Sequence, residues 1–194
     1  TRPALFQNHS LSVSGGKNKY RYYASGSYLN EDGILEDNNY KRYTFRLTQD
    51  YAVTTKFKLG MILGYSHYNS ENKPYSLFTQ AYNAAPLFNV YNADGSFSNT
   101  DKSDVGNPYA TLATTNSSSY GNRVTGVIWG EYQIIKGLSF RTSYGIDAER
   151  NNGYNYTPVY YTYLPNGATA GQKNEKSDLS YSGDSLYHWT WDNY

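Results

Sequence analysis

The sequence contains no cysteine and only one methionine. The absence of cysteine excludes disulfides and thiolate metal sites, and it leaves the redox compartment undetermined. No run of about 18 apolar residues occurs, so the sequence contains no transmembrane helix. The net charge of +1 gives no strong electrostatic reason for binding to nucleic acid or to an anionic membrane surface. We therefore expect neither a nucleic acid partner nor a helical membrane protein.

Tyrosine is abundant, with 24 copies, and aromatic residues make up 18% of the chain. Glycine contributes a further 17 residues. Aromatic side chains fit a pleated strand and glycine fits turns, so this composition favours strands and turns over helices. The mean hydropathy of -0.76 would indicate a soluble or disordered chain. That average misleads where apolar and polar residues alternate strictly, so the order of the residues has to decide.

Alternation of apolar and polar residues with period two, which is typical of strands, recurs along the chain. It is clearest where Tyr43, Phe45 and Leu47 alternate with arginines and threonines. The pattern predicts about seven strands, near residues 9–15, 19–30, 42–48, 57–66, 122–135 and 138–150, with a last one that ends around 191. The phase of the fifth strand stays open, because Val127 and Trp129 lie opposite Val124, Ile128 and Tyr132.

The connections between these strands alternate in length. Short links at 15–18, 51–55 and 136–137 alternate with loops at 31–39, 69–121 and 151–176. A membrane β-barrel has short periplasmic turns and longer extracellular loops, and its strands need roughly 9–11 residues to cross at a tilt. A soluble sandwich has no reason to sort its connections by side. We therefore predict an all-β fold, in which residues 1–194 form part of the antiparallel wall of a transmembrane β-barrel with long extracellular loops at about 69–121 and 151–176.

The two faces of such a wall have different surroundings. The apolar face contacts lipid, the opposite face can be polar, and aromatic belts lie at both interfaces. An arginine at a lipid-facing site in the mid-membrane costs about 2–4 kcal/mol, so we expect Arg46 and Arg141 to face the interior. The expected belts comprise Tyr20, Phe57, Tyr132, Phe140 and Trp191 near the short turns, and Tyr28, Tyr43 and Tyr65 near the long loops.

Several segments together resemble the SusC/RagA family of TonB-linked (TonB-dependent) outer-membrane transporters. The resemblance extends over most strands and their turns, whereas the two long loops are individual. The segments that carry it are 7–16 (QNHSLSVSGG), 22–25 (YYAS), 28–34 (YLNEDGI), 40–47 (YKRYTFRL), Asn107-Pro108, 131–141 (EYQIIKGLSFR) and 144–147 (YGID).

The resemblance implies a 22-stranded barrel with an N-terminal plug, energised through the TonB complex and capped by a SusD-like lipoprotein. It implies import of oligosaccharides or peptides across the outer membrane of a Gram-negative bacterium, with no enzymatic step and no cofactor. The chain begins at Thr1 without a signal peptide, TonB box or plug, so we expect a partial β-barrel domain cut from a longer protein. An odd number of strands does not close a single-chain bacterial barrel.

No catalytic or metal-binding constellation stands out. His9, His67 and His188 lie on three different predicted strands without the spacing of metal ligands. Triples of serine, histidine and aspartate can be assembled by chance from so serine-rich a chain, and no nucleophile-elbow motif supports one. We therefore expect no catalytic residue and no metal site.

Two groups of oxygen-bearing side chains have both a functional and an ordinary interpretation. Asp147 and Glu149 share one face of the sixth strand with Arg141, and they could act as an acid–base pair or be solvated charges of a barrel interior. Residues 94–101 place oxygen ligands at alternate positions, as calcium loops do, but lack the glycine at position six and the acid at position twelve. An ordinary Asp-Gly turn is the favoured interpretation there.

The first long loop is rich in aromatic residues. Aromatic faces beside amide and carboxylate groups suit the binding of sugar rings, and function in such barrels usually lies on long loops. The alternative is that these residues fold the loop on itself or pack against a partner. The substrate-binding candidates are Tyr82, Phe88, Tyr91 and Tyr109, in a loop that also contains Tyr75 and Phe78.

Two rival classes of protein remain open. A soluble tyrosine-rich β-sandwich that binds carbohydrate would need a core between two sheets, so both alternating faces would be partly buried. An outer-membrane hydrolase or adhesin would share the barrel wall, and only a catalytic cluster in the lumen or loops would distinguish it.

Overall fold

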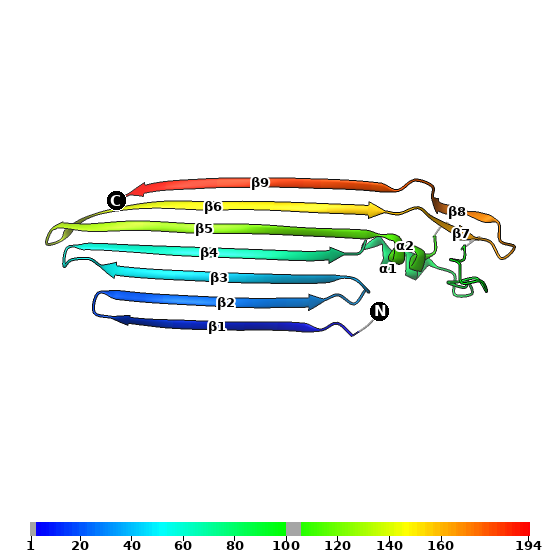
Figure 1. The fold of residues 1–194 in the computed structure, drawn as a ribbon, viewed down its shortest axis with the longest axis horizontal. Coiled ribbons are helices and arrows are strands. Elements are labelled where there is room, and N and C mark those ends of the chain that lie inside the picture. The colour runs from blue at the N-terminus through cyan, green and yellow to red at the C-terminus, as the bar shows by residue number, and fades with distance from the viewer. Residues whose placement is uncertain (1–2, 100–105) are drawn as a thin grey trace.

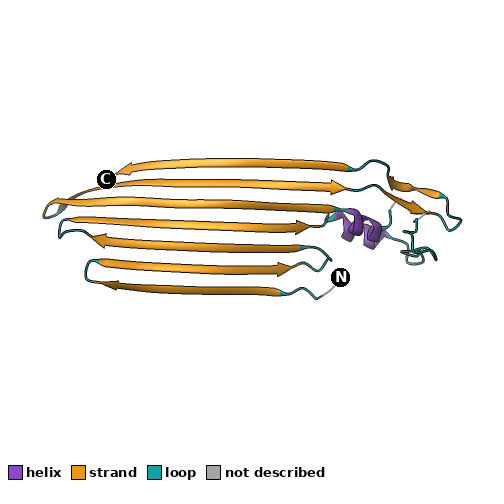
Figure 2. Ribbon diagram, viewed as in Figure 1, coloured by secondary structure: helices purple, strands orange, loops and turns teal. Residues whose placement is uncertain are grey.

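A computed structural model describes residues 3–99 and 106–194, and most of them lie in one antiparallel sheet (Figures 1 and 2). The sheet has the strand order β1-β2-β3-β4-β5-β6-β9, and the smaller β7-β8 sheet and two short helices lie beyond one end of it. The large sheet comprises β1 Phe6–Lys17, β2 Tyr20–Asp32, β3 Asn39–Ala52, β4 Phe57–Asn72, β5 Asn116–Ile135, β6 Leu138–Thr157 and β9 Asp178–Asn193. The remaining elements are α1 Ser76–Asn83, α2 Pro108–Thr114, β7 Tyr160–Tyr163 and β8 Thr169–Asn174.

The register of the large sheet aligns most of the large apolar residues of the seven strands on one face. Leu47, for example, lies between Ala24 of β2 and Leu63 of β4, and Ile128 lies between Met61 and Tyr144. The apolar face, as we call it, carries Leu11, Val13, Phe45, Leu59, Val124, Ile146, Trp189 and Trp191 in addition to these residues. The opposite, polar face carries Arg21, Arg42, Arg46, Arg123, Arg141, Asp147 and Glu149.

The register also settles the phase of the fifth strand. Ile128 belongs to the apolar face, whereas Trp129 lies on the polar face opposite Gly60. A Cβ atom at residue 60 would come within 2.3 Å of the Trp129 ring, so a glycine is required where this indole crosses β4. The guanidinium of Arg141 lies 4.1 Å from the centroid of the same ring. Arg46 and Arg141 both lie on the polar face, as predicted.

The connections are sorted between the two ends of the sheet (Figure 1). The turn side carries the links 18–19, 53–56 and 136–137, and the loop side carries the links 33–38, 73–115 and 158–177. Asn18 and Gly137 supply the left-handed backbone that two of the short turns need, with φ of 52° and 90°. The residues paired across the sheet from Tyr20, at the start of β2, lead through β3 and β4 to Gly130 of β5. Gly130 lies several residues before β5 ends at its turn. The turns are thus staggered, as tilted barrel strands require.

The strands reach farther toward the loops than the sequence pattern predicts. Strand β4 continues to Asn72, β5 begins at Asn116 and β6 continues to Thr157. Backbone pairing therefore goes on after the apolar alternation has ended. Two helices, α1 and α2, lie in the stretch 73–115, where only a loop was predicted. No helix in the described part of the chain is long and apolar enough to cross a membrane.

No second layer of the described chain covers the apolar face. Phe45 and Leu59 keep 43% and 42% of their surface exposed, although they lie in central strands. The β7-β8 pair is the other sheet formed by residues 3–99 and 106–194, and it extends beyond the loop side instead of packing on the strands (Figure 2). The soluble β-sandwich is therefore not the fold, and the predicted single wall of a barrel is confirmed.

Candidate functional site

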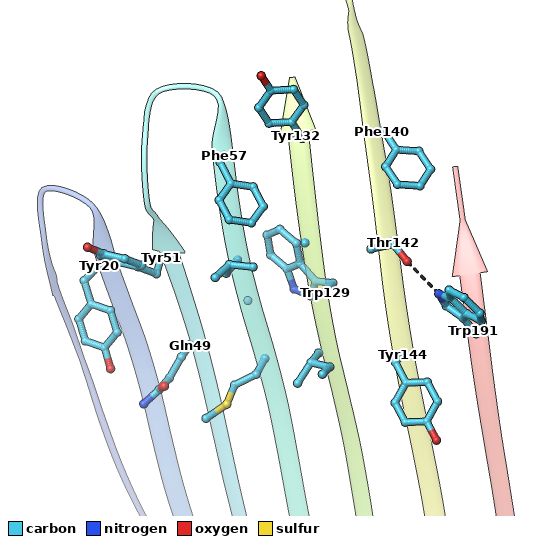
Figure 3. Close-up of a pocket in the computed structure, with 15 residues that line it drawn as sticks. Tyr20, Gln49, Tyr51, Phe57, Trp129, Tyr132, Phe140, Thr142, Tyr144 and Trp191 are labelled. Carbon is cyan, nitrogen blue, oxygen red and sulfur yellow. Dashed lines mark hydrogen bonds between the residues drawn. The ribbon is translucent and has the colours of Figure 1, made fainter. Parts of the chain in front are cut away.

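On the apolar face, aromatic side chains gather at the turn side around an open hollow of about 800 Å³ (Figure 3). The indole Nε1 of Trp191 donates a hydrogen bond of 2.9 Å to Oγ1 of Thr142, so its polar group is satisfied. Rings that are apolar except for one satisfied polar end are typical of a membrane-interface belt. The predicted belt residues Tyr20, Phe57, Tyr132, Phe140 and Trp191 all line this hollow. Its lining suits hydrocarbon chains and not a polar nutrient.

A second aromatic group lies toward the loop side of the same face. The rings of Tyr28 and Tyr43 are 5.1 Å apart, and Tyr43 stacks on His67 at 6.4 Å. Tyr65 donates a hydrogen bond of 2.8 Å to Oδ1 of Asn122, and Nδ1 of His67 lies 2.9 Å from the same oxygen. His67 thus has neighbours typical of an interfacial side chain and not of a metal ligand.

The polar face carries an ion-pair group on β5 and β6. Arg123 donates two hydrogen bonds to Asp147, Nε to Oδ1 at 2.9 Å and Nη2 to Oδ2 at 2.6 Å. Its Nε also lies 3.8 Å from Oε2 of Glu149. About half of the Arg123 side chain is exposed, so this pairing adds little to stability. Both carboxylates are held by one arginine, which agrees with solvated interior charges and leaves no free acid–base pair.

A chain of hydrogen bonds continues from this group across the polar face. The Asn151 amide donates to Glu149 at 2.8 Å and to Asp184 at 3.3 Å, and it accepts a bond of 3.0 Å from the Tyr68 hydroxyl. The Tyr68 ring stacks on Tyr40 at 6.0 Å. This part of the face therefore presents linked polar side chains to solvent.

On the loop side, Asn107 connects the two long loops. Its side chain begins α2 by accepting hydrogen bonds from the backbone N–H of Tyr109 and Ala110, at 3.0 and 3.2 Å. Its amide nitrogen donates to the carbonyls of Val90 and Ser98, both at 2.9 Å. Its backbone N–H donates to Oε1 of Gln172 in β8 at 2.5 Å, so one buried residue joins segments far apart in sequence.

A second connection between the loops runs through Tyr163 at the end of β7. Its N–H donates to the carbonyl of Phe97 at 2.9 Å, and its carbonyl accepts from the N–H of Asn99 at 3.0 Å. The buried hydroxyl of Thr162 donates to the carbonyl of Gln172 at 2.7 Å. We call the connected segments 73–99, 106–115 and 158–177 the loop unit, because these bonds join them into one body.

The loop unit brings two of the four predicted aromatic site residues together. Tyr91 stacks on Phe97 with centroids 5.5 Å apart, and the edge of Tyr109 meets Tyr91 at 5.6 Å. Partial desolvation and a hydrogen bond with the Tyr109 hydroxyl raise the pKa of Tyr91 above its usual value. The group offers partly exposed ring faces beside hydroxyl and amide donors.

The other two predicted site residues do not join this group. Tyr82 lies on α1 with 90% of its surface exposed, and no ring contact is found for it among the described residues. Phe88 is half-buried in the turn after α1, where its N–H donates to the carbonyl of Ala85. Near the start of α1, Tyr75 and Phe78 contact each other at 5.8 Å.

The possible calcium segment begins as an Asp-Gly turn. Oδ1 of Asp94 accepts hydrogen bonds from the backbone N–H and the hydroxyl of Ser96, at 2.9 and 2.6 Å, and Gly95 takes a φ of 84°. These bonds lower the pKa of Asp94. The last two residues of the segment, Thr100 and Asp101, lie outside the described residues. Within the described ranges, no group of three or more metal-binding side chains occurs.

Sequence reasoning missed the role of Asn107 and its partner Gln172. An asparagine before a proline is a recognised start of a helix, since asparagine caps the free N–H groups and proline fits the first turn. That signal could have predicted α2. The contact with Gln172 had no sequence signal, because it joins two loops that are separated by two long strands.

Comparison with known proteins agrees with this geometry. The chain is 28% identical over 176 residues to TonB-dependent receptor P3 of Formosa agariphila, which covers 85% of this chain and 17% of the relative. It is 26% identical over 158 residues to TonB-dependent receptor P26 of the same organism, covering 80% of this chain and 16% of the relative. The chain thus spans about a sixth of the length of these curated relatives. No family model matches the sequence.

Solved structures share the fold. The RagAB peptide importer in its closed-closed state superposes with a TM-score of 0.60 and 19% identity, over 78% of this chain and 18% of the other. The open-open state gives a TM-score of 0.61 and 13% identity, over 96% and 30% of the two chains. The named relatives are receptors and importers, which agrees with the prediction of no enzymatic step. The resemblance found in the sequence is therefore confirmed: the chain is similar over most of its length to TonB-dependent receptors, and its sheet has the fold of part of the barrel wall in the RagAB structures.

Proposed function

We propose that residues 1–194 belong to an outer-membrane nutrient transporter of a Gram-negative bacterium. The observation that carries the proposal is the register of the large sheet, which places most of the large apolar side chains on one face and most of the charges on the other. In lipid every backbone polar group must be paired, so a wall of this kind spans the membrane as part of a closed barrel. The turn side then faces the periplasm, and the loop unit faces the cell exterior.

Labelling of introduced cysteines in the full-length transporter tests this orientation. This segment contains no cysteine, so Asn166→Cys in the loop unit and Lys136→Cys in a short turn each add one thiol here, and the unmodified protein is the control. We expect a membrane-impermeant maleimide to label the variant at 166 on intact cells, and the variant at 136 only after the outer membrane is permeabilised. Labelling of both sites on intact cells, or of neither after permeabilisation, would contradict the proposal.

The loop unit is the proposed place of first contact with the nutrient. Support comes from the stacked group of Tyr91, Phe97 and Tyr109, since aromatic faces beside polar donors bind sugar rings and peptide side chains. We propose ligand contact for all four predicted residues, with Tyr91 and Tyr109 as the main pair and Tyr82 and Phe88 as peripheral contacts. The nutrient is an oligosaccharide or a peptide, and the polar face provides the wet surface past which it moves.

Ligand capture by the full-length transporter tests the loop proposal. The purified protein is incubated with a maltooligosaccharide mixture or with a tryptic digest of casein, and the retained molecules are identified by mass spectrometry. We expect Tyr91→Ala to lower retention of one of the two probes about two- to tenfold, as expected for a lost stacking contact, and Tyr91→Phe to keep it. Equal retention by Tyr91→Ala and the wild type would remove the loop proposal and leave the orientation of the wall unaffected.

The partners follow from the same proposal. A SusD-like lipoprotein would cover the loop unit from outside, and a TonB complex would act through parts of the transporter outside residues 1–194. Co-purification of a lipoprotein with the full-length transporter, and its loss when residues 73–115 are replaced by a short glycine–serine link, tests the first of these. A lipoprotein that remains bound to the shortened variant would show that it docks elsewhere.

A further inference from the structure

The apolar face changes its chemistry in a fixed order from the turn side to the loop side. The apolar band ends at the aromatic group around Tyr43 and Tyr65. Two cations lie at this edge of the band on the same face: Arg150 on β6 is in the register row of Tyr43, and Lys41 on β3 is one row farther toward the loops. We call them the cationic border. Beyond it, tyrosine rings and amides cover the strands up to the loops. The following steps rest on the proposed membrane location.

The position of the cationic border matches the edge of the hydrocarbon layer. Lys41 lies about ten residues along β3 from Tyr51, and Arg150 lies about ten residues along β6 from Phe140, which is the span that a tilted strand needs to cross the hydrocarbon. Tyr51 and Phe140 both line the turn-side aromatic hollow. Both cations therefore lie where lipid headgroups begin.

Both cations are available to a ligand. Lys41 and Arg150 are exposed, and neither forms an ion pair with a residue that the structure describes. Arg123, by contrast, is paired on the polar face. Asp32 and Glu71 lie farther toward the loops on the apolar face, and Asp32 is already bonded by the Asn39 amide. Unpaired cations at this depth attract the phosphate groups of lipids.

A further donor lies beside Arg150. Asn122 is its register partner on β5. The Asn122 Oδ1 already accepts the Tyr65 hydroxyl and contacts Nδ1 of His67. Its amide nitrogen is therefore the group left to donate, and the guanidinium and this amide together could bind one phosphate.

The tyrosines beyond the border form a ladder across three strands. Tyr154 on β6 stacks on Tyr120 of β5 at 6.1 Å and contacts Tyr181 of β9 at 5.0 Å. The Tyr181 hydroxyl donates to Oδ1 of the buried Asn152, which fixes the end of the ladder. A hollow of about 300 Å³ beside it is lined by Tyr154, Tyr156, Asn116 and Ser118, together with Asp37, Glu71, Asn72, Lys73 and Ser117. Such a surface suits sugar rings.

We propose that this part of the apolar face binds a phosphorylated glycolipid of the outer leaflet, with acyl chains on the apolar band, phosphate on the cationic border and sugars on the tyrosine ladder. An ordinary phospholipid would fill the first two positions and leave the ladder uncovered. The three surfaces occur in the order in which such a glycolipid presents its parts from the membrane centre outward.

Lipid retention by the full-length transporter, extracted from outer membranes in mild detergent, tests this proposal. Mass spectrometry measures the amounts of phosphorylated glycolipid and of phospholipid per protein. The test variant is Lys41→Gln with Arg150→Gln, and the matched control is Arg42→Gln with Arg46→Gln. The control removes the same charge from neighbouring positions on the polar face.

We expect the test variant to retain at least about tenfold less glycolipid, since each interfacial cation contributes about fivefold, and the control to retain the wild-type amount. Tyr154→Ala should lower glycolipid and leave phospholipid unchanged. Equal glycolipid retention in the test variant and the control, or no glycolipid on the wild-type protein, would overturn the inference. Absence of the full-length protein from the outer membrane would instead contradict the proposed function.

Discussion

The wall and the loop unit of this molecule are stabilised in different ways. Among the described residues of the large sheet, Asn152 has the one buried side chain. The loop unit has seven buried residues, which are Leu77, Ser98, Asn107, Ala110, Thr114, Thr162 and Ala170. The wall has backbone pairing but no core, because no other part of the described residues covers its apolar face. The loop unit has a small core that is held largely by hydrogen bonds.

This difference shows that the two regions depend on different solvents. At the proposed membrane location the wall has lipid on one face, since large apolar side chains such as Phe45 and Leu59 stay about two-fifths exposed in the described chain. In the described part of the loop unit, the buried polar side chains form hydrogen bonds within the unit, except at Oε1 of Gln80, as is usual where water is excluded. A change in the wall should therefore affect insertion of the barrel, and a change in the loop unit should affect only local order.

The largest expected effect tests the wall. Leu47→Arg in the full-length protein places a charge near the middle of the apolar face, where lipid-facing arginine costs about 2–4 kcal/mol. We expect a clear loss of the folded form that resists unfolding on unheated electrophoresis gels. Thr48→Arg is the matched control, because the next residue lies on the polar face. Equal losses in both variants would mean that the two faces do not differ in their surroundings.

A smaller effect should separate the loop unit from the wall. Asn107→Ala removes a helix cap and two further buried hydrogen bonds, at a cost of about 1–3 kcal/mol. We expect faster proteolytic cleavage within 73–115 and 158–177 in the full-length protein, with an unchanged folded barrel on gels. Asn166→Ala, which removes one exposed turn bond to the N–H of Ala168, should cleave at the wild-type rate. Loss of the folded barrel in the Asn107 variant would show that the regions are not independent.

The smallest effect concerns the exposed turn at Asp94. Hydrogen bonds from Ser96 lower the pKa of this carboxyl, so its contribution to the turn is present above the usual carboxyl pKa and is lost as pH falls through the lowered value. We expect Asp94→Ala to increase cleavage near residue 95 at neutral pH by about twofold or less, and to differ less from the wild type in acid. A larger difference in acid than at neutral pH would contradict this sign.

The wall was predictable because one repeating rule governs it. Alternation with period two identifies the strands, and the lengths of the links order them without any knowledge of distant contacts. Strand β5 is the exception, since Trp129 occupies the polar face where Gly60 of the neighbouring strand leaves room for it. The ends of β4, β5 and β6 were also missed, because pairing there continues with polar residues on both faces.

The candidate site was only partly predictable. Aromatic composition predicted Tyr82, Phe88, Tyr91 and Tyr109 alike, and it could not indicate that Tyr91 and Tyr109 contact each other while no ring contact is found for Tyr82 among the described residues. The separation depends on Asn107, whose bonds reach Val90 and Ser98 in its own loop and Gln172 in the other. Contacts between two irregular segments leave no periodic trace in a sequence.

The bond between Asn107 and Gln172 has a consequence for how a protein with these two paired loops can diversify. Replacing one long loop by recombination would leave the other with a donor or acceptor lacking its counterpart. The two loops should therefore be inherited, or grafted onto a different barrel, as a matched pair. Exposed ring positions such as Tyr82 can meanwhile vary freely, so new ligand preferences can arise without rebuilding the frame that presents them.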